Sequence, residues 1–318
     1  MHLSADQFNV HIIGVGNMGG GMARNLLAQG WQVHVHDLEV AKVDILRKLG
    51  ATPSIIHQYI ATKIIVIIVC VVTEKQTEQV LFGLDGIAKS LPLGATVMLC
   101  PTMAPEDVER FAIALTAQGI HTIDAPMSGG PARAADGSMS LMVACAENVW
   151  VRCGPLLNAL SSKLFRISEK VGDAARTKLV NNLVAGINLV GAAEGLAMAQ
   201  KMGLNLAKTL DVIEQSSGQS WVGSDRMRRA LAGDYAPRAH LSLLEKDTRL
   251  AVGAANSAGF TGPLGLTASR VFAAASAGGL QDWDDAALLK WLAEKPVNGL
   301  YLGGIGPAFG GQWACALK

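Results

Sequence analysis

The chain has 318 residues, of which 50% are hydrophobic and 17% charged, and its formal net charge is +1. This length predicts two domains, and the composition is sufficient for a large hydrophobic core. A nearly balanced charge gives no electrostatic basis for binding nucleic acid or an anionic membrane surface.

The cysteines and the apolar runs predict a location for the protein. The five cysteines form no CxxC pair and no metal-like spacing, so we expect reduced thiols, no metal site and a cytoplasmic protein. No signal peptide is expected, because Asp6, Gln7 and Asn9 interrupt any apolar segment. The longest apolar run, residues 64–72, is typical of a buried strand and is too short to cross a bilayer.

The first half of the chain alternates apolar strands with helices. Strands are expected at 9–14, 32–37, 64–72, 95–100 and 120–124, and helices near 18–29, 39–48, 76–82 and 105–117. A strand near 139–145, a helix at 148–160 and a short strand near 163–167 follow. Near-continuous apolar strands separated by helices predict a parallel sheet covered on both faces.

A glycine-rich turn follows the first strand and has the pattern of a dinucleotide site. Gly14 permits a tight turn, Gly16 lets the backbone approach a pyrophosphate, and Gly19 lets the next helix pack closely on the strand. The helix N-terminus offers N–H groups to the phosphates. The residues expected at the cofactor are Gly14, Gly16, Asn17, Met18 and Gly19. The alternative is a glycine turn that binds no ligand.

Asp37 ends the second strand, about twenty residues after this turn, which is the usual spacing for a residue that binds the adenosine ribose. Its carboxylate would accept hydrogen bonds from the ribose hydroxyls and would repel a 2′-phosphate. We therefore expect NAD as the cofactor rather than NADP.

The segment Asp124–Gly130 (DAPMSGG) follows the strand at 120–124 and therefore lies at the carboxyl edge of the sheet. Open α/β sheets bind ligands at that edge. The hydroxyl of Ser128 and the backbone N–H groups of Gly129 and Gly130 suit a substrate carboxylate, although an ordinary Ser-Gly-Gly loop is the alternative. Thr102, after the strand at 95–100, could reach the nicotinamide or the substrate.

The pattern changes at Gly172, and the second half reads as all-helical. A helix from Asp173 to about Met202 would be roughly 45 Å long. Further helices are expected near 206–216, 221–232, 242–258 and 263–278. The predicted organisation is a doubly wound Rossmann domain at 1–170, an all-α domain at 171–295 joined to it by the long helix, and an irregular tail at 296–318.

Two lysines in the second half are candidates for chemistry. Lys178 and Asn182 lie four residues apart on one face of an otherwise apolar helix, where a buried lysine with a lowered pKa could act as a base. Lys246 could place positive charge beside the substrate or the cofactor, oriented by Asp247. The alternatives are a surface lysine with a structural asparagine, and a solvated charged triplet at 245–247.

Four segments, in order along the chain, resemble the β-hydroxyacid dehydrogenase family: GVGNMGGGMARNL (14–26), DAPMSGG (124–130), KLVNN (178–182) and EKDTRLA (245–251). The resemblance implies that Lys178 is the catalytic lysine and Asn182 assists it. It also implies that Ser128, Gly129 and Gly130 bind the substrate carboxylate. Thr102 and Lys246 would lie close to cofactor and substrate, and such proteins usually form dimers or tetramers.

Within the family, residues 76–83, 220–228 and 233–235 look most like the L-threonate dehydrogenase branch, which oxidises the C2 hydroxyl of a four-carbon sugar acid with NAD. Pro101, residues 73–75 and Arg133 depart from the family pattern near the expected cleft, so they leave the substrate open. The other readings are an NADPH-dependent tartronate semialdehyde reductase, a 3-hydroxyisobutyrate or serine dehydrogenase, and a dinucleotide-binding sensor without turnover.

Overall fold

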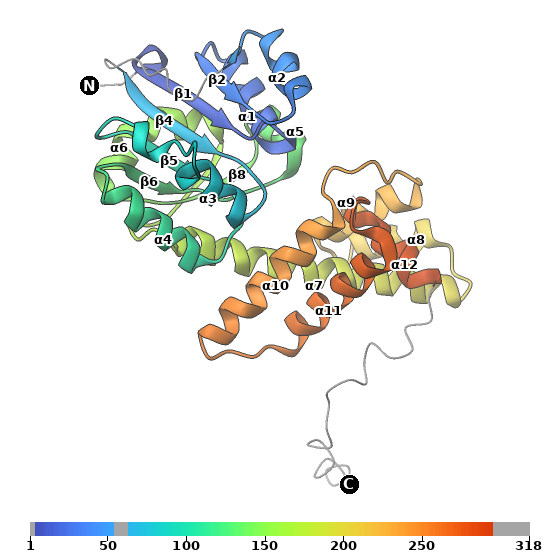
Figure 1. Ribbon diagram of the computed structural model, residues 1–318. Coiled ribbons are helices and arrows are strands. Elements are labelled where there is room, and N and C mark those ends of the chain that lie inside the picture. Colours follow the sequence, from blue (N-terminus) through green and yellow to red (C-terminus); the bar gives the residue numbers. More distant parts are fainter. Residues whose placement is uncertain (1–3, 54–62, 295–318) are drawn as a thin grey trace. The chain divides into compact units, whose positions relative to one another are not determined.

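The computed structural model describes residues 4–53 and 63–294 (Figure 1). They form two units. The first contains the residues up to Val184 together with Lys246–Gly262, and the second contains Ala185–Glu245 and the residues from Pro263. The expected tail at 296–318 lies outside the described residues, and the domain boundaries expected from the sequence stay a prediction.

The first unit is built on a sheet that, within the described residues, has the strand order β3-β2-β1-β4-β5-β6-β8-β7, with β9 beside β8. The strands are β1 (Phe8–Ile13), β2 (Val33–His36), β3 (Thr52–Pro53), β4 (Ile64–Val69), β5 (Thr96–Leu99), β6 (His121–Asp124), β7 (Met127–Ser128), β8 (Ser140–Ala144) and β9 (Lys163–Ser168). Strands β3, β2, β1, β4, β5 and β6, which are neighbours in this order, are all parallel. The direction in which the chain adds strands to the sheet reverses between β1 and β4. Ligands of doubly wound sheets bind at such a reversal.

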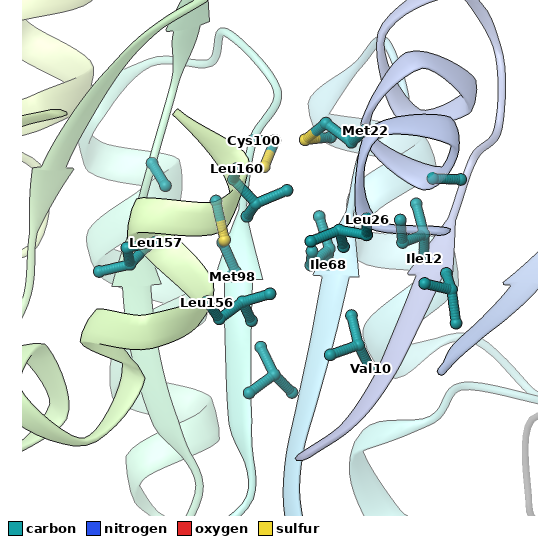
Figure 2. Close-up of a cluster of buried hydrophobic side chains, with 14 of the residues drawn as sticks. Val10, Ile12, Met22, Leu26, Ile68, Met98, Cys100, Leu156, Leu157 and Leu160 are labelled. Carbon is teal, nitrogen blue, oxygen red and sulfur yellow. The ribbon is translucent and has the colours of Figure 1, made fainter. Parts of the chain in front are cut away.

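Helices cover both faces of this sheet, as the sequence predicts. The helices are α1 (Asn17–Ala28), α2 (Val40–Arg47), α3 (Glu74–Phe82), α4 (Pro105–Thr116), α5 (Gly130–Ala135) and α6 (Glu147–Leu160), with a 3₁₀ turn η2 (Ala88–Ser90). Strand β4 is apolar throughout because its Val66 and Ile68 face one core and its Ile67 faces another. Figure 2 shows the first of these cores, in which Leu26 of α1 and Leu156 of α6 lie on the sheet.

Strand β8 departs from the parallel arrangement predicted for the sheet. It pairs with β6 in the antiparallel sense, through Asp124 and Ala144. A parallel connection must carry the chain back along the whole strand length, usually by a longer helix. Helix α5 has six residues, about 9 Å, so it is too short for that return. It packs instead against α1, where a Cβ atom on Gly21 would come within 2.8 Å of Ala134 Cβ.

The helices and turns of the second unit form its described structure without any extended strand, as expected. Its elements are the C-terminal part of α7 (Asp173–Lys201), α8 (Leu206–Glu214), α9 (Trp221–Leu231), the start of α10 (Leu241–Ser257), α11 (Pro263–Ala275), the short turns η3 (Ser276–Leu280) and η4 (Asp285–Ala287), and α12 (Leu288–Glu294). Leu196, Phe272 and Leu288 are among its fully buried side chains. Helices α7 and α10 each contribute residues to both units.

Candidate active site

The glycine turn between β1 and α1 has the backbone that a dinucleotide site requires. Gly14 has φ +87°, and a Cβ atom there would lie 2.6 Å from the carbonyl oxygen of Cys70. A Cβ atom on Gly19 would lie 2.0 Å from the carbonyl oxygen of Gly14. Gly16, by contrast, has no atom within 4 Å of its Cβ position. The turn is therefore closed toward the sheet and open at Gly16, which fits a bound pyrophosphate.

Asp37 lies beside this turn at the end of β2. Its Oδ2 accepts a hydrogen bond from the backbone N–H of Val15 at 2.8 Å, and its Oδ1 accepts one from the N–H of Glu39 at 2.9 Å. The carboxylate is therefore held against the turn by the backbone. The sequence placed Asp37 near the turn but gave no sign of these two contacts.

The Ser128–Gly130 loop connects β7 to α5. Ser128 pairs with Ser140 of β8, and it is followed by two glycines in left-handed conformations, Gly129 at φ +129° and Gly130 at φ +78°. Side chains other than hydrogen are strained at such φ values, so the loop needs glycine at both positions. A Cβ atom on Gly129 would lie 2.9 Å from Cδ of Arg133, so the stem of that arginine packs against the loop.

Lys178 and Asn182 lie on a buried face of α7, and both side chains are less than a tenth exposed. The Asn182 amide donates a hydrogen bond of 2.5 Å to Oδ2 of Asp247, which is also buried. The pKa of the Lys178 ammonium is lowered to about 8: burial is the largest cause, the charge of Asp247 opposes it, and the charge of Lys246 adds to it. A lysine with this pKa can exchange a proton near neutral pH.

Lys246 connects α10 to the carboxyl ends of two strands. Its Nζ donates to the carbonyl oxygen of Thr102 at 2.7 Å and to that of Val72 at 3.2 Å, and it lies 3.1 Å from Oδ1 of Asp247. Thr102 follows β5, and Val72 follows β4. Asp247 thus contacts both Lys246 and Asn182. The sequence suggested the first of these contacts but not the second.

The candidate residues fall into three groups within the first unit. The glycine turn and Asp37 form one group, and the Ser128–Gly130 loop forms another. The third group is Lys178, Asn182, Asp247 and Lys246, joined to Thr102 by a hydrogen bond. Among residues 4–53 and 63–294, no set of three His, Cys, Asp or Glu side chains is placed to hold a metal ion.

Comparisons with known proteins agree with this arrangement. A family model described as the NAD-binding domain of 6-phosphogluconate dehydrogenase matches residues 9–168. A second, described as NAD-binding of NADP-dependent 3-hydroxyisobutyrate dehydrogenase, matches residues 172–292. The L-threonate dehydrogenase of Escherichia coli K12 is 34% identical over 90% of this chain and 95% of its own length. The chain belongs to the β-hydroxyacid dehydrogenase family. It is an NAD(P)-dependent oxidoreductase that acts on the CH–OH group of a hydroxy acid.

Solved structures of the family support the fold. A 3-hydroxyisobutyrate dehydrogenase from Salmonella typhimurium is 35% identical and matches with a TM-score of 0.82 over 89% of this chain and 99% of its own. Psf3, described in complex with NADP⁺ and 2-OPP, is 28% identical, with a TM-score of 0.81 over 89% of this chain and all of its own. The names of these relatives differ in the hydroxy acid, and that of Psf3 includes NADP⁺.

Helix α7 is long and apolar enough to cross a membrane by length and composition, although the core helix of many globular proteins passes the same test. In this family member the helix carries the buried Lys178 and the hydrogen-bonded Asn182.

Proposed function

We propose that this protein oxidises a small hydroxy acid with NAD, at C2 of a sugar acid such as L-threonate, with Lys178 as the general base. The observation that carries this proposal is the burial of Lys178, whose pKa is lowered to about 8. It shares a face of α7 with Asn182, which is hydrogen-bonded to Asp247 of α10. The similarity to L-threonate dehydrogenases supports the choice of substrate.

The chemistry needs a hydride acceptor and a base. NAD supplies the acceptor at its nicotinamide ring. Lys178, as a neutral amine, takes the proton of the C2 hydroxyl, and a pKa of about 8 leaves a useful fraction neutral near pH 8. Asn182, whose amide is held by Asp247, orients the substrate hydroxyl or the amine.

The other candidate residues position the two ligands. The open side of the glycine turn at Gly16 holds the pyrophosphate. The hydroxyl of Ser128 and the N–H groups of Gly129 and Gly130 bind the substrate carboxylate. Thr102 contacts the nicotinamide or the substrate, and Lys246, which donates to the Thr102 carbonyl oxygen, holds this segment in place.

A substrate screen tests the proposed reaction. We expect NADH to form from NAD with L-threonate, and to form more slowly with other tetronates, glycerate, 3-hydroxyisobutyrate and serine, followed by absorbance at the NADH band. Consumption of NADPH with tartronate semialdehyde, together with no oxidation of any hydroxy acid, would instead establish the semialdehyde reductase.

The choice of nucleotide rests on Asp37. Replacing Asp37 by Asn removes its charge but keeps one oxygen to accept the N–H of Val15. Because the ribose hydroxyls then lose a charged acceptor and a 2′-phosphate is no longer repelled, the ratio of kcat/KM for NAD over NADP should fall about tenfold or more. Steady-state kinetics with both nucleotides measure this ratio.

The matched control is Asp44→Asn, which removes an exposed carboxylate paired with Arg47 on α2. That variant should keep the wild-type ratio. An Asp37→Asn enzyme whose nucleotide preference is unchanged would show that Asp37 supports only the turn. A wild-type preference for NADP would contradict our assignment of NAD.

A sensor that binds a dinucleotide without turnover is the non-enzymatic alternative. It would need the glycine turn but not a buried lysine, an expensive group to bury for no purpose. We further propose a cytoplasmic homodimer or homotetramer, as the family resemblance implies. Light scattering of the purified protein gives the number of subunits.

A further inference from the structure

Asp124 begins the DAPMSGG segment, yet the proposed mechanism gives it no part. It is the last residue of β6, and its backbone is fixed in the sheet between Leu99 of β5 and Ala144 of β8. The next residue, Ala125, donates its N–H to the carbonyl oxygen of Leu99 at 2.9 Å. The side chain of Asp124 is 1% exposed. Asp124 is therefore a rigidly held, buried carboxylate.

The Asp124 carboxylate binds the start of the lysine helix. Its Oδ2 accepts hydrogen bonds from the backbone N–H of Gly172 at 2.9 Å and of Ala175 at 3.0 Å. Helix α7 begins at Asp173, and the first N–H groups of a helix have no partner within the helix. The carboxylate of Asp173 itself accepts hydrogen bonds from the side chains of Ser168 and Arg176. The helix is thus capped by a carboxylate of the sheet, from a position about 50 residues earlier in the chain.

These bonds act close to Lys178, which lies three residues after Ala175, within one helical turn. Ala174, Ala175 and Leu179 around it are almost fully buried, so the first turns of α7 are packed as well as capped. A helix is stiff over a single turn, so a bond that holds the N–H of Ala175 also sets where the Lys178 side chain starts. Its burial, and with it its lowered pKa, depends on that placement.

The same residue also leads into the Ser128–Gly130 loop. Three residues separate Asp124 from Ser128, and one of them, Pro126, accepts a hydrogen bond from the N–H of Met142 in β8. The strand end that caps α7 is therefore the one that leads into the Ser128–Gly130 loop. The Asp124 carboxylate therefore links the start of α7, which carries Lys178, to the segment that carries the Ser128–Gly130 loop.

We propose that Asp124 is a positioning residue of the reaction, which caps the first turn of α7 and thereby keeps Lys178 in register with the Ser128–Gly130 loop and shielded from water. This inference rests on the proposed role of Lys178. A cap with a merely structural role would affect thermal stability but not the proton affinity of one particular lysine.

The test measures the pKa of Lys178 in Asp124→Ala. Competitive acetylation of the folded protein over a range of pH, with mass spectrometry of the peptide containing Lys178, reports this pKa without any substrate. We expect about 8 for the wild type and a rise of about one unit or more in Asp124→Ala, because a frayed first turn admits water. The charges on Lys246 and Asp247 that face Lys178 are unchanged in this variant. Its kcat should fall about 10- to 100-fold.

Two further variants sharpen the comparison. Asp124→Asn keeps an acceptor oxygen at the same reach and should hold the Lys178 pKa within about half a unit of wild type and kcat within about threefold. If Asp124→Ala does not fold, Asp124→Ser replaces it, since the shorter serine cannot reach both N–H groups. Asn205→Ala removes a side-chain cap of α8 in the second unit and should lower the melting temperature without changing the Lys178 pKa.

An unchanged Lys178 pKa and kcat in a folded Asp124→Ala or Asp124→Ser protein overturns the inference. So does an equal rise of that pKa in Asn205→Ala. A rise in Asp124→Ala or Asp124→Ser, without one in Asp124→Asn or Asn205→Ala, supports it even if no hydroxy acid is oxidised, since acetylation needs no turnover. A wild-type enzyme that oxidises hydroxy acids, with no such rise, leaves the proposed function intact and refutes the role of Asp124.

Discussion

Replacing Lys178 by methionine is expected to lower kcat by about 10²–10⁴-fold, the range for loss of a general acid or base. Methionine has nearly the shape of the lysine stem and fills the same buried space. The glycine turn and Asp37 are untouched, so the Kd for NAD, measured by calorimetry, should stay within about twofold of wild type. Turnover at the wild-type level would remove Lys178 from the mechanism.

Although the kcat of Lys178→Met should fall, its stability should increase. The pKa of Lys178 is about 8 in the folded protein and near 10.5 when exposed, so the unfolded chain holds more protons between these values. Wild-type stability therefore rises with pH across that window, and below it the buried charge is a cost. Lys178→Met removes this cost, and we expect the free energy of unfolding at pH 7 to rise by about 1–3 kcal/mol.

Two comparisons separate lost chemistry from lost structure. Lys201→Met changes an exposed lysine at the far end of the same helix and should leave kcat unchanged. Lys178→Ala leaves a space beside Asn182, and added methylamine should restore part of its activity in proportion to the neutral amine. Absence of any rescue, together with a melting temperature well below that of wild type, would point to a structural defect.

Local patterns along the chain were sufficient to predict most of the first unit. The apolar runs predicted β1, β4 and β5, and the glycine spacing predicted the start of α1, because these features depend on neighbouring residues. The direction of β8 could not be predicted, since it depends on the shortness of α5, a helix that the sequence did not predict. Helix α5 itself begins with Gly130-Pro131, which reads as a turn.

The candidate site divides in the same way. Lys178 and Asn182 could be paired from their spacing, since residues four apart share a helix face. The partner of Asn182 could not be found, because Asp247 lies 65 residues further along the chain. The carbonyl oxygens that bind Lys246 belong to segments 144 and 174 residues away and leave no trace in side-chain identity. Contacts of this kind arise only once the sheet edge and α10 have been brought together.

Replacing Asp247 by Asn should shift the pH dependence of the reaction downward. The charge of Asp247 raises the pKa of Lys178 against the effect of burial, so its removal lets that pKa fall below about 8. The rise of kcat/KM with pH, which follows deprotonation of Lys178, should therefore move to lower pH by about one unit. On the plateau the rate should still fall about 10- to 100-fold, because a weaker base abstracts the proton less well and Asn182 loses its charged acceptor.

The direction of this shift separates the role of Asp247 from that of Asp124. Loss of Asp124 exposes Lys178 to water and should raise its pKa, whereas loss of Asp247 leaves it buried without its counter-charge and should lower it. As a control, Asp282→Asn replaces an exposed carboxylate in the second unit and should leave the pH profile of kcat/KM unchanged. An upward shift in Asp247→Asn would mean that Asp247 keeps water away from Lys178 rather than supplying charge, because rehydration raises the pKa of a buried lysine whereas loss of an anionic neighbour lowers it.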